Sequence, residues 1–377
     1  SQQGDRKEQG HCMDIVTNLA IDWIKENKDG DQPFMLMCQH KAPHRCWMPA
    51  LRHLDLYKDQ DIPEPDTLFD SYSDNAAASR NQEMEIDRHM DLVCDLFTTP
   101  PKGWTHEGLN TDKSGWRNLQ TMTKEQRAAW DAAFAEENEA FAKAELTGKE
   151  LVRWKYQRYA KNYLRCVRGV DDSVGRIMQF LKDNQLEDNT IVVYSSDQGF
   201  YIGDHGWYDK RWMYEESLKM PLIVKWPGVT KAGSVNKHMV QNLDFAETFL
   251  QMAGADIPHD MQGRSLVPLL KGEDVTDWRK SIYYHFYEYP SVHMVPRHNG
   301  VRSERYKLIQ IYEFGEWEFY DLEKDPDEKQ NLYNNPAYQT QIAAHKQELE
   351  SLRSRYGDNT VTGLRPAQWR EKYRLAK

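Results

Sequence analysis

Two oxygen-bearing side chains stand side by side at the end of an apolar segment. Asp197 and Gln198 follow residues 191–195, IVVYS, and precede Gly199. A carboxylate and an amide oxygen are hard ligands that suit Ca²⁺ or Mg²⁺, and a glycine lets the chain turn sharply beside them. A simple Asx-type turn would use the same residues in the same order. The dipeptide alone favours the turn, so a metal site depends on partners elsewhere in the chain.

A lysine, Lys210, follows this pair in the next loop. A lysine held close to a divalent cation is costly unless an anion lies between the two charges. Phosphate and sulfate esters are anions of this kind. The alternative is a solvated surface lysine, which is the usual state of Lys in a loop.

A second polar group follows another apolar segment, residues 33–39. It contains His40, Lys41 and His44. A histidine at the end of a buried strand can donate a proton to a leaving group or stabilise a developing oxyanion. A single histidine there would be structural in most proteins, whereas two with a lysine between them raise the case for function.

Charged pairs around these segments are candidates for holding a ligand. Asp209 and Arg211 flank Lys210, and Arg297 and His298 occur in MVPRHNG. Asp with Arg is a common way to hold sugar hydroxyls, and Arg also binds anions with its planar fork. The alternative is a surface ion pair between neighbours, which contributes little energy.

The elements that must position these residues alternate along the chain. Helical spacing over 14–27 precedes a predicted strand over 33–39, and a long amphipathic helix over 156–184 precedes predicted strands at 190–196 and 220–226. This alternation predicts an α/β fold with a mixed, largely parallel sheet between helices, in which ligands bind outside the carboxyl ends of strands.

Three further regions are predicted from the composition and periodicity of the sequence. Residues 78–150 are charged and helix-prone, which indicates a helical insertion in a domain that covers 1–275. Its Trp104, Trp116 and Trp130 are candidates for lining a sugar subsite. Alternating segments after 275 and an amphipathic helix predict a smaller antiparallel C-terminal α+β subdomain over 276–357, followed by a tail over 358–377.

Composition narrows the class of protein. The 377 residues are 39% hydrophobic and 12% aromatic, which is ample for a core and unlike a disordered chain. The net charge is −10 with both signs interspersed, so nucleic acid is not an expected partner. No apolar run approaches the roughly 18 residues that span a bilayer. The five cysteines lack zinc-type spacing, and their odd number argues against a disulfide framework.

Taken together, these segments resemble the sulfatases of the alkaline phosphatase superfamily. The resemblance covers most of the chain, in the family order, through five segments: PFMLMCQHKAPHRCWMP, VVYSSDQGFYIGDHGWYDKRWMYEESLKMPLIV, NLDFAETFLQMAGADIP with MQGRSLVPLL, GVRSERYKLIQ, and EFYDLEKDPDEKQNLY. Singly these signals are moderate, and five in order are strong. The details HKAPHR, DKRWMYEES and HMVPRHNGVR are most similar to bacterial exo-acting N-acetylglucosamine-6-sulfatases of glycosaminoglycan breakdown.

The resemblance implies roles for individual residues. Asp197 and Gln198 match the family's later calcium ligands, although the family more often has Asn or His at the second place. Lys210 matches the lysine that holds the sulfate. His44 matches the histidine that assists the sulfate oxygen and the leaving group, and Asp209, Arg211 and His298 would read the sugar. One Ca²⁺, a sulfated carbohydrate substrate and a periplasmic or secreted location are implied in the same way.

One part of the family pattern is missing from this sequence. Sulfatases use a Cys or Ser in a C/S-x-P-x-R motif, which is oxidised to formylglycine, and an N-terminal aspartate pair completes the calcium site. No Cys or Ser here begins that motif, and the nearest, CWMPALR at Cys46, has the wrong spacing. We therefore expect the chain to be a C-terminal fragment that is inactive alone. Two alternatives stay open: a phosphonate monoester or phosphodiester hydrolase, and a non-catalytic paralogue that binds sulfated glycans.

Overall fold

The computed structural model describes residues 8–76, 79, 82–105 and 114–360. The chain divides into two compact units. Unit 1 comprises residues 1–65 and 85–190, and unit 2 comprises residues 66–84 and 191–377.

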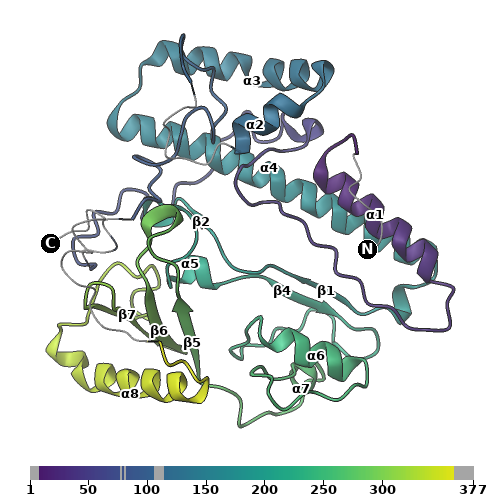
Figure 1. Cartoon of the computed structure of the whole chain (residues 1–377), viewed down its shortest axis with the longest axis vertical. Helices are drawn as coiled ribbons and strands as arrows, with labels where there is room; N and C mark the ends of the chain where they lie inside the picture. The colour runs from purple at the N-terminus through teal and green to yellow at the C-terminus, as the bar shows by residue number, and fades with distance from the viewer. Residues whose placement is uncertain (1–7, 77–78, 80–81, 106–113, 361–377) are drawn as a thin grey trace. The chain divides into compact units, whose positions relative to one another are not determined.

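Unit 1 is built from helices (Figure 1). They are α1 (Cys12–Asn27), η1 (Leu51–His53), α2 (Ser114–Thr121), α3 (Lys124–Ala144), α4 (Gly148–Asp183) and η2 (Glu187–Asn189). The predicted helices at 14–27 and 156–184 are thus present as α1 and the larger, C-terminal part of α4. α1 packs against α4, and Gly169 of α4 makes room for Met13, because a Cβ at Gly169 would lie 2.3 Å from the Met13 Cε.

The helical insertion predicted over 78–150 contains α2 and α3, while its residues 78, 80–81 and 106–113 lie outside the described part of the chain. α3 begins with a capping box between Thr123 and Gln126. Trp130 is 2% exposed and packs against Phe97 and Phe134. The prediction that Trp130 lines a sugar subsite is therefore wrong, because its ring fills the core of this unit. The same suggestion for Trp104 and Trp116 stays a prediction.

The strand predicted over residues 33–39 is wrong. The segment has no regular secondary structure, Met35 and Met37 are each 60% exposed, and it pairs with no strand among the described residues. Apolar composition favours extended backbone, whereas a strand also requires a partner that accepts and donates its backbone hydrogen bonds.

Unit 2 contains three small sheets and several short helices (Figure 1). β1 (Val192–Ser195) pairs with β4 (Leu222–Lys225), and β2 (Tyr201–Ile202) pairs with β3 (Tyr208–Asp209). Its helical elements are η3 (Asp204–Gly206), α5 (Glu215–Leu218), α6 (Asp244–Met252), α7 (Val267–Leu270), η4 (Val292–Met294), η5 (Pro336–Tyr338) and α8 (Gln339–Arg355). Every ladder between described residues is antiparallel, so the parallel pairing expected for the sheet is not formed among them.

The third sheet of unit 2 has four antiparallel strands in the order β5 (Ser281–Phe286), β6 (His298–Ser303), β7 (Tyr306–Ile311) and β8 (Glu316–Asp321). α8 lies along β5, β6 and β7 (Figure 1). The predicted alternating strands and closing helix are therefore present, while the boundaries 276–357 remain a prediction. Val301, Leu308 and Phe319 from the sheet pack with Ile342 and Leu349 of α8 to form one core.

A second core in unit 2 holds the loop that follows Asp197. Trp207, Trp212 and Tyr214 of this loop are fully buried and pack with Ile309 and Tyr320 of the sheet. Each of these rings removes a large apolar area from water, so the loop is fixed by burial although it contains little regular structure. The residues between these aromatic anchors, including Lys210, are held in place by them.

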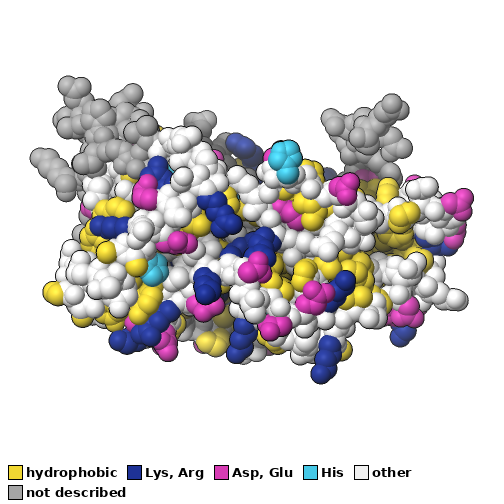
Figure 2. All heavy atoms as spheres, turned by 90° about the horizontal axis from the view of Figure 1, so that it is seen from below, with side chains coloured by type: hydrophobic (Ala, Val, Ile, Leu, Met, Phe, Trp, Pro, Cys, Tyr) yellow, Lys and Arg dark blue, Asp and Glu magenta, His cyan; other side chains and the backbone are white. Residues whose placement is uncertain are grey.

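Charges of both signs lie beside each other on the face that Figure 2 shows, as the sequence predicted. Among the helices of the described residues, none combines the length and the apolar character needed to cross a membrane. The five cysteines, all of them in described positions, are free thiols.

Candidate functional site

The loop after β1 carries Asp197 and Gln198, and Gly199 fixes its path. The backbone N–H of Gly199 donates to the Ser217 carbonyl at 2.9 Å. A Cβ at Gly199 would lie 1.9 Å from the carbonyl oxygen of Glu216 in α5. Glycine is needed here because the loop presses against the backbone of α5. This contact, which the sequence alone does not reveal, holds the position of the two oxygen-bearing side chains.

The side chain of Asp197 is exposed, and Gln198 is half-buried. The Asp197 carboxylate accepts a long hydrogen bond of 3.3 Å from Ser196 Oγ. A carboxylate and an amide oxygen fit a hard cation such as Ca²⁺ by the chemistry of their donor atoms. Among the described residues there is no group of three or more His, Cys, Asp or Glu side chains that would complete a metal site. The pair is therefore suited to be one part of a ligand set.

Lys210 is buried beside one carboxylate that it shares with a second cation. It is 8% exposed, and its Nζ lies 3.2 Å from Asp209 Oδ1 and 5.5 Å from the centre of the Phe200 ring. Arg211 Nη1 donates to the same Asp209 oxygen at 2.8 Å. Two positive groups against one negative group leave a net positive charge at this point of unit 2. Such an excess favours an anion as ligand.

His293 completes this cluster, and the sequence did not single it out. Its Nε2 lies 2.9 Å from Asp209 Oδ2, and its Nδ1 lies 2.7 Å from the Glu83 carbonyl oxygen. Both ring nitrogens thus face acceptor oxygens, and these two contacts fix the orientation of the ring. The position between two prolines in PSVHMVP is only a weak signal for such a role.

The environment of Asp209 keeps it ionised. Burial alone would raise the pKa of this carboxyl group. The hydrogen bond from His293 and the positive charges of Arg211 and Lys210 outweigh burial and hold the pKa of Asp209 well below its usual range. Asp209 is therefore a fixed negative charge around which three donors are arranged.

The backbone on both sides of Lys210 adopts the left-handed region. Asp209 has φ of +75° and Arg211 has φ of +106°. Such conformations are costly for residues with a side chain and persist only where the surroundings determine them. Here the Arg211 carbonyl accepts a hydrogen bond of 2.7 Å from Tyr284, and its N–H donates to Ser217 Oγ at 3.2 Å. Strain at both neighbours points to a constraint on the direction of Lys210.

His298 is fully buried in a stack of aromatic rings. Its ring lies over Trp212 at 4.8 Å and near Tyr284 at 5.6 Å. Burial lowers the pKa of His298 to about 4, although the hydrogen bond to the Pro296 carbonyl opposes this. Nδ1–H donates to that carbonyl at 2.8 Å. The histidine is therefore neutral at pH 7, and its Nε2 is an acceptor with no partner among the described residues.

His44 belongs to unit 1, whereas the other predicted site residues belong to unit 2. Its side chain is exposed, and its Nδ1–H donates to the Arg45 carbonyl at 2.7 Å. Arg45 anchors this loop, because its guanidinium donates twice to the buried Asp95, both at 2.7 Å. His40 faces Cys38 instead, with Nε2 3.7 Å from the sulfur.

Comparison with known proteins identifies the family. The family profile described as "Sulfatase" matches residues 2–255, and the profile described as "N-sulphoglucosamine sulphohydrolase, C-terminal" matches residues 203–355. The chain belongs to the sulfatase family. The resemblance seen in five sequence segments is thereby confirmed.

Individual relatives agree with this assignment. The sulfatase is 43% identical over 357 residues to an N-acetylglucosamine-6-O-sulfatase of Bacteroides thetaiotaomicron, covering 93% of this chain and 63% of the relative. It is 28% identical over 364 residues to the multifunctional alkaline phosphatase superfamily protein PehA of Trinickia caryophylli, covering 93% of this chain and 61% of that protein. The chain thus spans about three fifths of the length of these curated relatives.

A solved structure gives the same result for the fold. The sulfatase superposes with a TM-score of 0.89 on a protein determined in complex with its substrate, D-glucosamine-2-N,6-O-disulfate. The identity is 42%, and the match covers 94% of this chain and 72% of that chain. The predicted α/β fold of alkaline-phosphatase type is confirmed by this likeness.

Proposed function

We propose that this sulfatase hydrolyses a sulfate ester of a sugar, namely the 6-O-sulfate of N-acetylglucosamine in a glycosaminoglycan. The main support for this substrate is the 43% identity to an N-acetylglucosamine-6-O-sulfatase over 93% of this chain. The likeness at 42% to a protein solved with a 6-O-sulfated glucosamine supports the same substrate class. Identity to a solved phosphonate monoester hydrolase of Silicibacter pomeroyi is lower, at 25% over 58% of this chain, which favours a sulfate ester over the phosphonate alternative.

The cluster around Lys210 is suited to bind the sulfate group. Lys210 and Arg211 share the single carboxylate of Asp209, so the excess positive charge would be offset by a sulfate oxygen. Lys210 would act on charge that increases as the ester bond breaks. Its restricted surroundings support this role, because a donor that is already oriented loses little entropy when the reaction occurs.

The side chains next to Lys210 would recognise the sugar. Arg211 is partly exposed and retains donors beyond its bond to Asp209, so it can meet a hydroxyl or anionic oxygen of the substrate. His298 is fully buried among aromatic rings, so it would act on the sugar site only by holding those rings, including Trp212, in place. Asp209 would contribute by holding Arg211 and Lys210 in their places.

His44 would supply the proton for the leaving sugar oxygen. Its Nδ1 is engaged with the Arg45 carbonyl, so proton transfer is assigned to Nε2. The buried ion pair between Arg45 and Asp95 would keep the ring in this orientation.

Asp197 and Gln198 would hold part of a Ca²⁺ site. A bound calcium ion would stabilise negative charge on the sulfate oxygens. The 377 residues contain no Cys or Ser in a C/S-x-P-x-R motif, and no attacking group is assigned to this chain. A periplasmic or secreted location is part of the proposal and follows from the family likeness.

The test uses the protein isolated from its native source. Its intact mass and a map of its peptides would identify a formylglycine, and sulfate release would be measured from N-acetylglucosamine-6-sulfate, from a 2-O-sulfated sugar and from a phosphonate monoester. The proposal expects release from the 6-sulfate at the highest kcat/KM. Preference for the phosphonate, or tight binding of the sulfated sugar without turnover, would replace it by one of the alternatives.

A further inference from the structure

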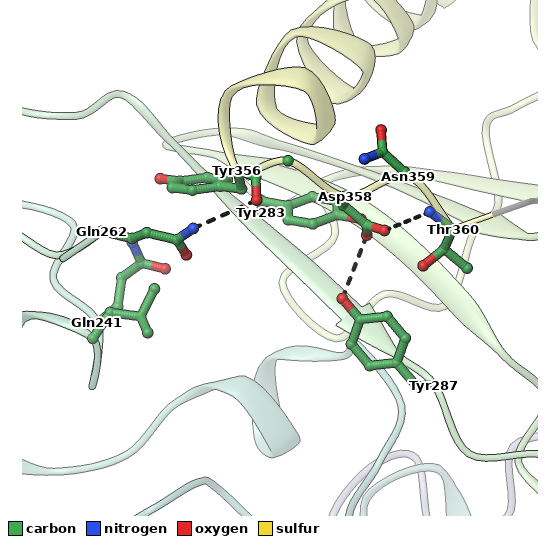
Figure 3. A pocket seen from close by; sticks show the side chains of 10 residues that line it. Gln241, Gln262, Tyr283, Tyr287, Tyr356, Asp358, Asn359 and Thr360 are labelled. Carbon is green, nitrogen blue, oxygen red and sulfur yellow. Dashed lines mark hydrogen bonds between the residues drawn. The ribbon is translucent and has the colours of Figure 1, made fainter. Parts of the chain in front are cut away.

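A pocket that contains none of the predicted site residues lies in unit 2, between the C-terminal sheet and the loops around α6 and α7. Its volume is about 600 Å³. Figure 3 shows the side chains that line it. They are Gln241, Leu243, Gln262, Tyr283, Tyr287, Tyr356, Asp358, Asn359 and Thr360, with Gly357. Pockets of roughly 300–1,000 Å³ are the size that binds a small organic ligand.

A fixed carboxylate, Asp358, forms one wall of this pocket (Figure 3). Its Oδ2 accepts hydrogen bonds of 2.5 Å from the Tyr283 hydroxyl and 2.5 Å from His285 Nδ1. Its Oδ1 accepts the backbone N–H of Thr360 at 2.9 Å. Burial would raise the pKa of Asp358, but the hydrogen bonds from Thr360 and Tyr283 outweigh it and hold this pKa well below its usual range. The wall therefore carries a rigid negative charge at neutral pH.

Aromatic rings supply the apolar part of the lining. Tyr283 and Tyr356 lie nearly parallel, with ring centres 6.2 Å apart and 17° between their planes. Tyr287 is 57% exposed, and its hydroxyl makes only a long bond of 3.4 Å to Asp358. An exposed tyrosine with a weakly held hydroxyl can turn to a ligand with little loss of existing contacts.

Amide side chains supply the hydrogen-bonding part. The side chain of Gln262 donates to the Tyr356 carbonyl at 3.4 Å, which leaves its amide oxygen as an acceptor. The backbone N–H of Gln241 donates to Asp244 at 2.8 Å, so the position of this residue is fixed while its side-chain amide faces the pocket. Amides both donate and accept, which is what a ring of hydroxyl groups requires.

The charge of the lining selects against an anion. Among the described residues that form the pocket, none is a lysine or an arginine. Arg353 of α8 uses its guanidinium to donate to the Thr360 carbonyl at 2.7 Å and to Glu350. An ionised Asp358 without a cation in the lining disfavours a sulfate group and leaves uncharged, hydroxyl-rich ligands.

We propose that this pocket binds an uncharged sugar ring, separately from the sulfate site. Sugar rings have apolar C–H faces that pack on tyrosine, and hydroxyls that bond to amides and to a carboxylate. The wall at Gln241 is next to Asn242, whose Nδ2 lies 3.5 Å from the Asp197 carbonyl oxygen. One residue thus separates the wall of the pocket from a contact with the loop of the candidate metal ligands. Only the source of the ligand, a non-sulfated unit of the same glycan, rests on the proposed function.

The experiment measures binding without turnover. N-acetylglucosamine and N-acetylglucosamine-6-sulfate are titrated into the 377-residue chain by calorimetry, or followed by ligand-detected NMR. Tyr287→Ala and Gln262→Ala remove two lining groups, and Tyr194→Ala serves as the matched control because Tyr194 is 36% exposed on β1 and lies outside the pocket. We expect Tyr287→Ala to weaken binding of the uncharged sugar about tenfold, with a smaller effect of Gln262→Ala and none of Tyr194→Ala.

The outcomes separate this site from the sulfate site. Lys210→Met should leave binding of N-acetylglucosamine unchanged, so a failure of sulfate hydrolysis does not decide the result. Equal binding by Tyr287→Ala and Tyr194→Ala, with circular dichroism showing both to be folded, would overturn the proposal. So would binding of the 6-sulfate that is as strong as that of the uncharged sugar and equally sensitive to Tyr287→Ala, because the lining would then not select by charge.

Discussion

His293 Nε2 lies 2.9 Å from Asp209 Oδ2, and both side chains are buried in unit 2. The two residues are 84 positions apart in the sequence. This contact holds the carboxylate whose other oxygen is shared by Lys210 and Arg211. We therefore expect the direction of the buried lysine to depend on His293, whose two ring nitrogens face Asp209 and the Glu83 carbonyl.

Replacing His293 tests this dependence. His293→Ala should lower the free energy of unfolding by about 2–3 kcal/mol, because a hydrogen bond to a buried charge is lost. In the native protein it should also lower kcat/KM through misplacement of Lys210. Chemical denaturation and sulfate release would measure the two effects. His259→Ala, at an exposed histidine, is the control. Unchanged kinetics in a destabilised His293→Ala protein would assign His293 a purely structural role.

Lys210 is expected to act on the reacting group itself. Lys210→Met keeps most of the apolar stem of the side chain and removes its charge, so the native protein should lose about 10²–10³-fold in kcat with a stable fold. Lys231→Met, at an exposed lysine, should have no effect. Steady-state kinetics on N-acetylglucosamine-6-sulfate would measure the loss. A wild-type kcat in Lys210→Met would remove this residue from the catalytic group.

Gly199 should tolerate no side chain. Gly199→Ala would place a Cβ 1.9 Å from the Glu216 carbonyl oxygen and 2.3 Å from that of Lys219, and both atoms belong to the backbone rather than to a flexible side chain. We expect the free energy of unfolding to fall by about 2–3 kcal/mol. Gly175→Ala is the matched control, because nothing lies within 4 Å of that helical position, and it should be neutral or stabilising by about 0.5–1 kcal/mol. Similar stabilities of the two variants would contradict the close approach.

A buried carboxyl group in unit 2 predicts a pH dependence of stability. Burial raises the pKa of Glu328 to about 7, and the nearby Glu215 adds to this although Lys307 opposes it. Glu328 accepts the backbone N–H of Glu215 at 2.7 Å and lies 2.7 Å from Lys307 Nζ. A pKa that is higher in the folded than in the unfolded protein gives stability that is lost as the pH rises through the folded value.

The measurement compares wild type with Glu328→Gln between pH 5 and pH 8. Relative to the variant, the wild type should lose free energy of unfolding as the pH rises to about 7, by at most about 1.4 kcal/mol per pH unit. Above pH 8 the difference between the two proteins should be constant. Parallel curves over the whole range would show that Glu328 does not titrate in this window.

Calcium removal should affect stability and activity together. Chelation of the native protein is expected to lower its Tm and stop sulfate release, and added Ca²⁺ should restore both, because a ligand that binds the folded state stabilises it. Asp197→Asn should weaken Ca²⁺ binding at least about tenfold, since a charged ligand is lost. Asp256→Asn, at an exposed position, is the control. A Tm insensitive to chelation in the wild type would contradict the assignment of Asp197 and Gln198.

Local patterns in the sequence determined a large part of this protein. Apolar residues at helical spacing predicted α1 and α4, and alternation predicted β5, β7 and β8, because these periods follow from the geometry of a single element. The acid and amide after β1 and the lysine in the next loop were candidates by residue type, although the dipeptide alone favours a turn, and their site stays a prediction. Family segments then gave those residues roles, and the family itself is confirmed by comparison.

Tertiary structure decided what depends on partners distant in the chain. Residues 33–39 have the composition of a strand, but they pair with no strand among the described residues. Composition does not specify the neighbour that strand pairing requires. The need for glycine at position 199 comes from its contact with α5. The burial of His298 comes from the aromatic rings that enclose it, and the position of the Asp209 carboxylate comes from its contact with His293. These contacts depend on packing between elements far apart in the sequence, so no local pattern encodes them. The physical reason is that burial and charge pairing act through space, whereas composition and periodicity act along the chain.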